Sequence, residues 1–240
     1  MAFGDTINTE KGNQASGDAS ITISPTATEG NLLLFGVGRG ATHSAGGDWG
    51  TPAGWETVHD SGINTGNLGA AWFWKISDGT ETSVATAGSG HQGATQSVYA
   101  EIEGPFAASP LDVKEENATL LSTVGTSISS GTTGTTAQND EIAIAFFASD
   151  RFDTIDGTRA YTNSFTEVVI SDGTGSRASS WLAKKVLSAT GTVESTFSCT
   201  DTGDEMYGSI ATWKKEAAGE APTIPPKVVF MNQAVERANL

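Results

Sequence analysis

The stretch AAWFWKIS, residues 70–77, has a second version in the same chain: SSWLAKKV, residues 179–186, aligns Trp181 with Trp72 and Lys184 with Lys75. Each stretch has the composition of a strand, and Trp72 and Trp74 lie two residues apart, so that on a strand both rings lie on one face of the sheet. Because the tryptophan recurs, we expect Trp72 and Trp181 to lie at matching core positions. Trp74 aligns with Ala183, so the shared fold does not require it.

The repeat continues in the strands on either side. The matched stretches are GNLLLFGVGRG (from Gly30) with NDEIAIAFFAS (from Asn139), GWETVHDSG (Gly54) with SFTEVVISDG (Ser164), GTETSVAT (Gly79) with GTVESTFS (Gly191), and SVYAEIEG (Ser97) with GSIATWKK (Gly208). Upstream, DASITISP (Asp18) resembles GTSISSG (Gly125), and DTINTEKGN (Asp5) loosely resembles DVKEENATL (Asp112). The offset between the five closely matched stretches stays between 109 and 112 residues. Residues 1–104 and 111–215 are therefore predicted to be two copies of one unit, joined through GPFAASP.

Composition agrees with an all-β protein. Hydrophobic residues make up 37% of the chain and charged residues only 17%, with 29 glycines, which suits many short strands joined by turns. The sequence predicts a jelly-roll-like β-sandwich over residues 1–215, since strands with an apolar face need a second sheet. Two separate sandwiches are the alternative, and we favour one sandwich because the linker is short and apolar.

After Lys215 the sequence changes character. Residues 216–226 are Pro-rich and predict a stiff linker. Residues 227–240 are predicted to form an arm that adds to a neighbouring subunit, with Lys227, Val228, Val229, Phe230 and Met231 as its partner-binding residues. A frayed terminus is the alternative.

Candidate sites are few. Trp49, Trp55 and Trp74 could form a carbohydrate-stacking platform if they are exposed, although large aromatic residues more often fill cores. Glu101 and Glu103 alternate along one strand and are interpreted as solvated surface groups rather than a catalytic acid pair. We find no signature of a catalytic site, and no enzymatic activity is expected.

No metal site or cofactor is expected either. The histidines His43, His59 and His91 lack the spacing of a zinc site. Acidic, Gly-rich loops such as SDGTE (residues 77–81) have the composition of calcium-binding loops, but none has a recognised calcium spacing, and Asp-Gly is also common in hairpins.

Net charge limits the classes of binding partner, and the cysteine count limits disulfide formation. The net charge of −15 argues against nucleic acid and against anionic membranes. Cys199 is the one cysteine, so no intramolecular disulfide is expected. The N-terminus lacks the pattern of a signal peptide, and we expect synthesis in a cytoplasm.

The order of motifs resembles a widespread class of phage and prophage virion proteins. The resemblance covers about residues 18–215 and rests on three elements: the PAGW turn at Pro52–Trp55, the aromatic strand ending in Lys at Ala70–Lys75, and the A-x-I-x-G…PLD junction at Ala100–Asp112. The second half departs from the pattern, since NSFTE from Asn163 stands where a second PAGW-like turn is expected.

The resemblance implies a jelly-roll component of a virion made in a bacterial host. Our first expectation is a non-enzymatic capsid decoration (cement) protein that binds the major capsid protein or other virion proteins and forms a homo-oligomer, taken to be a trimer. The alternative is a carbohydrate-binding tail or fibre module that recognises a receptor.

Overall fold

The structure is a computed structural model that describes residues 1–14, 19–40, 48–63, 68–88, 94–117, 125–150, 159–172, 178–203 and 205–217. Within these ranges the chain is all-β, with antiparallel strand pairs and no helix, as the sequence predicts. The predicted arm, Lys227–Met231, lies outside the described residues.

The first half contains a five-stranded sheet and a two-stranded sheet. The large sheet has the order β1-β7-β3-β5-β4, and β2 pairs with β6. The strands are β1 (Thr6–Gln14), β2 (Ser20–Thr22), β3 (Leu32–Gly40), β4 (Glu56–Ile63), β5 (Leu68–Ile76), β6 (Ser83–Ala85) and β7 (Ala94–Ile102).

The second half repeats this arrangement and adds one short strand to its small sheet, β11. Its large sheet has the order β8-β15-β10-β13-β12, and β14 lies between β9 and β11 in a small sheet. The strands are β8 (Phe106–Glu116), β9 (Gly125–Ser129), β10 (Glu141–Ser149), β11 (Ala160–Tyr161), β12 (Thr166–Asp172), β13 (Ser179–Val186), β14 (Thr196–Gly203) and β15 (Met206–Lys215). Every stretch matched in the sequence therefore falls on strands that hold the same place in the two halves.

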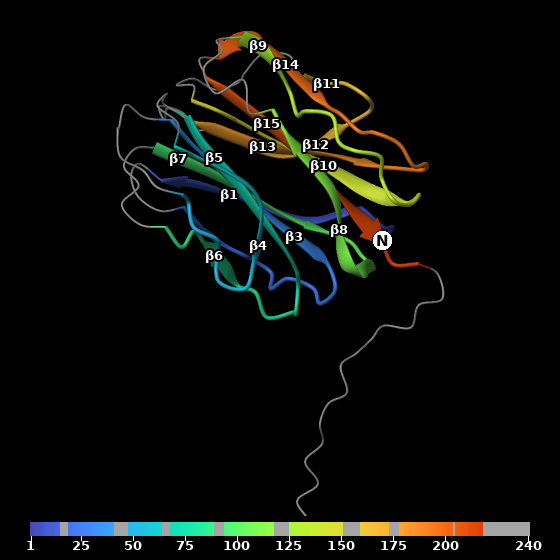
Figure 1. The fold of residues 1–240 in the computed structure, drawn as a ribbon. Helices are drawn as coiled ribbons and strands as arrows, with labels where there is room; N and C mark the ends of the chain where they lie inside the picture. Colours follow the sequence, from blue (N-terminus) through green and yellow to red (C-terminus); the bar gives the residue numbers. More distant parts are fainter. Residues whose placement is uncertain are drawn as a thin grey trace, which may run out of the picture.

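The four sheets form successive layers, with the two large sheets in the middle (Figure 1). Three cores lie between the layers. The shared core joins the inner faces of the two large sheets, and Leu34, Trp72 and Phe146 belong to it. The first outer core lies under β2 and β6, and the second lies under β9 and β14.

The expected single two-sheet sandwich is therefore too simple. Each half is sandwich-like in itself, and the halves pack together through their large sheets. The central strands show this arrangement, because β3 and β10 are buried along their whole length and are therefore covered on both faces. A strand covered on both faces has no need of polar residues at alternate positions, which is why LLLFGVGRG and EIAIAFFAS do not alternate.

The predicted match of Trp72 with Trp181 is wrong by one residue. The backbone carbonyls of Asn31 and Glu141 accept equivalent hydrogen bonds, from the N–H groups of Ser77 and Leu187 respectively. This relation aligns Trp72 with Leu182, and both side chains lie in the shared core, whereas Trp181 lies in the second outer core. Successive side chains of a strand point to opposite faces, so a shift of one residue exchanges the two cores.

The turn before β12 is the counterpart of the PAGW turn despite its different sequence. The N–H of Trp55 donates to the carbonyl of Pro52 at 3.0 Å, and the N–H of Phe165 donates to that of Thr162 at 3.3 Å. Gly54 and Ser164, at equivalent positions, both have a positive φ, of 79° and 63°. The departure noted in the sequence extends to the turn geometry, since Asn163 also has a positive φ, of 57°, whereas the equivalent Ala53 does not.

Candidate functional site

A pocket of about 410 Å³ opens in the second half beside the connection between β13 and β14. Residues 185–194 form most of its wall, and Thr132 and Asn163 complete it. The pocket contains one lysine, Lys185, and one acid, Glu194. Val186 at its edge is 48% exposed, which is unusual here for a large apolar side chain.

The pocket arises where the second copy of the connection is longer than the first. In the first half the chain takes seven steps from Ser77 to Val84, which pairs with Ile21 on β2. In the second half it takes ten steps between the equivalent residues, from Leu187 to Phe197. The connection of the second half is therefore three residues longer, and residues 187–194 of it line the pocket.

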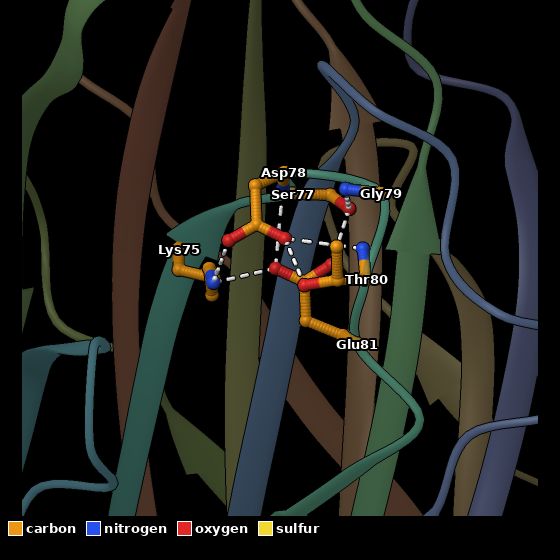
Figure 2. A network of polar contacts seen from close by, with 6 residues as sticks. All are labelled: Lys75, Ser77, Asp78, Gly79, Thr80 and Glu81. Atoms are coloured by element: carbon orange, nitrogen blue, oxygen red, sulfur yellow. Dashed lines mark hydrogen bonds and ion pairs between the residues drawn. The ribbon is translucent and has the colours of Figure 1, made fainter.

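In the first half the equivalent place is filled by a polar network (Figure 2). The Nζ of Lys75, at the end of β5, lies 2.5 Å from Oε1 of Glu81 and 3.3 Å from Oδ2 of Asp78. Glu81 also accepts hydrogen bonds from Ser77 Oγ at 2.7 Å and from the N–H of Asp78 at 3.1 Å. The loop SDGTE thus folds its carboxylates onto the lysine.

The electrostatics of this network favour the charged forms of both partners. Burial alone would raise the pKa of Glu81, but the donors Lys75, Ser77 and Asp78 N–H outweigh it, and the pKa is lowered. Burial likewise opposes the charge on Lys75, while its hydrogen bonds to Glu81 and Asp78 raise its pKa. The acids of SDGTE, which have the composition of a calcium loop, are therefore bound to an internal cation.

Lys185 is the structural counterpart of Lys75 but has different surroundings. Lys75 pairs with Leu33 across the sheet, and Lys185 pairs with the equivalent Ala143. Within the described part of the chain Lys185 forms no ion pair. The carboxylate of Glu194 is already used, since it accepts from Ser129 Oγ and Thr132 Oγ1, both at 2.9 Å.

The predicted tryptophan platform is not assembled. Trp49 and Trp55 lie in the first outer core and Trp74 lies in the shared core, on the opposite face of the same sheet. All three are buried, with at most 9% of the residue exposed. A ring enclosed in a core cannot stack on a sugar, so the structure contradicts the platform.

The interpretation of Glu101 as a surface group is also wrong. Glu101 is buried and its Oε1 accepts hydrogen bonds from Asn31 Nδ2 at 2.7 Å and from the N–H of Thr28 at 2.9 Å. Glu103 is half-buried, and the two are not arranged as an open acid pair. In the second half the position of Asn31 is held by Glu141, which is fully buried, and burial raises its pKa.

His59, on β4, lies between the two halves. Its Nδ1 is 3.6 Å from Oε2 of Glu116, which also accepts from Tyr207 Oη at 3.1 Å. Burial, assisted by the positive charge of Lys114, lowers the pKa of His59 to about 4. His43 and His91 lie outside the described residues. In the described ranges no group of three or more histidine, cysteine or acidic side chains could hold a metal.

In comparisons with protein-family models, curated proteins and solved structures, no match to the chain was found. No helix suited to crossing a membrane occurs among the residues that the structure describes. The pocket and the paired network of Lys75 are thus the features from which a binding function can be argued. The one-residue error in aligning β5 with β13 conceals the pocket at the level of sequence, because it matches Lys75 with Lys184 instead of Lys185.

Proposed function

We propose that this chain is a non-enzymatic structural protein of a bacteriophage virion, and that it decorates the outer surface of the capsid by binding the major capsid protein. The observation that carries the proposal is the order of motifs that resembles phage virion proteins. Each of these motifs has a structural counterpart: PAGW is a turn, AAWFWK is a core strand, and the AEIEG…PLD segment passes from β7 into β8.

The build of the molecule is consistent with a structural role. Each half covers its large sheet with a small one, the two large sheets bury each other, and the chain carries a net charge of −15. A strongly acidic surface keeps free copies soluble and apart, so attachment to a particle has to come from specific contacts. We take the body to be of jelly-roll type and the bound form to be a homo-oligomer.

The carbohydrate-binding tail or fibre module is not proposed, because the three tryptophans that suggested it are buried. The location on the capsid can be tested directly on whole particles. Particles from a lysogen that encodes the chain are banded on a density gradient and labelled with antibodies to the purified full-length protein. Particles lacking the gene serve as the control for the label.

The proposal predicts that the protein co-sediments with particles and that label lies over the heads. Label on the tails would contradict decoration and return the chain to the fibre class. Recovery of the protein only at the top of the gradient would contradict a place in the virion.

A further inference from the structure

The pocket of the second half and the Lys75 network of the first half occupy equivalent positions in the two repeats. Lys75 and Lys185 end equivalent strands on equivalent faces, yet only Lys75 is paired within the described structure. In the first half the chain itself supplies the carboxylates, from Asp78 and Glu81. In the second half residues 187–192 carry no acid, and Glu194, three residues before Phe197 as Glu81 is before Val84, accepts hydrogen bonds from Ser129 and Thr132 and forms no ion pair with Lys185.

We propose that the pocket binds an acidic turn of a partner protein, with Lys185 taking the partner's carboxylate as Lys75 takes that of Glu81. This inference does not depend on the virion role. The internal network shows the chemistry that such a lysine accepts: a carboxylate that pairs with the ammonium group and also accepts hydrogen bonds from its own turn.

The remaining walls suit a peptide turn. The cavity of about 410 Å³ has room for several residues and is partly open to solvent. The loop backbone on this wall is held in place, since the N–H groups of Thr190 and Gly191 donate to Asn139 Oδ1 at 2.9 Å and to Thr136 Oγ1 at 3.1 Å. Glu194 accepts its hydrogen bonds from two neutral hydroxyl groups and forms no ion pair with Lys185, so no carboxylate of the described residues pairs with this ammonium group.

The probe for the test is the chain's own acidic turn, the peptide Ser-Asp-Gly-Thr-Glu of residues 77–81 with both ends blocked. It is titrated into the full-length protein labelled with ¹⁵N, and amide shifts are followed by NMR. The matched neutral peptide, Ser-Asn-Gly-Thr-Gln, and free glutamate are titrated in parallel.

We expect the acidic peptide to shift the amides of residues 185–194 and the neutral peptide to bind at least about tenfold more weakly, because a hydrogen bond to a charged group is lost. Lys185→Met should weaken binding by a similar factor, whereas Lys185→Arg should keep it. Lys11→Met, at an exposed lysine of β1, is the control for a change of net charge.

Unchanged spectra around residues 185–194 up to millimolar peptide would overturn the proposal, as would equal binding of both peptides or of Lys185→Met. Equal shifts with free glutamate would assign the pocket to free carboxylates and overturn the claim of a peptide turn. Amide shifts of the strands away from the loop report whether each variant keeps its fold.

Discussion

Gly36 and Phe146 hold the same position in the two halves and meet each other in the shared core. A Cβ added at Gly36 would lie 2.5 Å from the ring of Phe146, which stacks on Trp72 with the centroids 5.9 Å apart. The small residue of one copy thus makes room for the large residue of the other. Such complementarity joins two related sheets without leaving a cavity.

Gly36→Ala should therefore destabilise the protein by about 1–3 kcal/mol, because the added methyl group forces the aromatic stack to move. Gly134→Ala is the matched control, since a Cβ there meets only Val113 at 3.8 Å. Chemical denaturation of both variants checks the difference. Equal stability of Gly36→Ala and the parent chain would contradict the packing described here.

We expect His59 to make the stability of the folded chain sensitive to acid. Its pKa of about 4 in the folded protein lies below the value near 6.5 expected for the unfolded chain, so folding favours the neutral ring. Stability from this group is present above pH 6.5 and decreases as the pH falls towards 4, by about 3 kcal/mol in total.

His59→Gln removes this titration while keeping a polar side chain. We expect the stability advantage of the parent chain over the variant to decrease by about 3 kcal/mol between pH 7.5 and pH 4, measured by urea unfolding at each pH. A difference that does not vary with pH would show that the histidine is not held neutral.

At the scale of elements, the sequence predicts the strands well and their registers less well. The near-constant offset locates every matched pair, because turns and apolar runs recur at that spacing. It does not identify which residue of β13 matches Trp72, since AAWFWKIS and SSWLAKKV align plausibly in two registers that differ only in the face buried. Equivalent hydrogen bonds at Asn31 and Glu141 resolve this, and the sequence does not display them.

The candidate pocket could not be predicted from the sequence either, because the sequence match aligns β5 and β13 one residue out of register. Its origin, three additional residues between β13 and β14, becomes visible only in a correctly aligned pair of repeats. Glu101 is misread from sequence because a buried carboxylate on an alternating strand looks like a solvated one until its partner, Asn31, is known.

Lys75 and Glu81 of the first half should contribute to stability as a coupled pair. A double-mutant cycle with Lys75→Met and Glu81→Gln is expected to give a coupling energy of about 1–3 kcal/mol, because Glu81 is well shielded from solvent. The control cycle uses Arg159 and Glu167, which are 3.0 Å apart but about 30% exposed, and should give less than about 1 kcal/mol. Equal coupling energies in both cycles would contradict the claim that shielding from solvent strengthens the Lys75–Glu81 ion pair.

At the scale of the whole molecule, the fold depends on the shared core. Strands β3, β5, β7, β10, β13 and β15 each face it on one side and an outer core on the other. A separated half would expose the inner face of its large sheet, with Leu34, Trp72 and Val98 in one case and Phe146, Leu182 and Trp213 in the other. The halves are therefore expected to fold and unfold together.

Scanning calorimetry of the full-length chain, with Phe146→Ala beside it, tests this claim most directly. We predict one transition whose calorimetric and van't Hoff enthalpies agree, and its displacement as a whole by Phe146→Ala, which should cost about 3–5 kcal/mol. Two resolved transitions, with only one of them moved by Phe146→Ala, would show that the halves are independent sandwiches and would contradict the shared core.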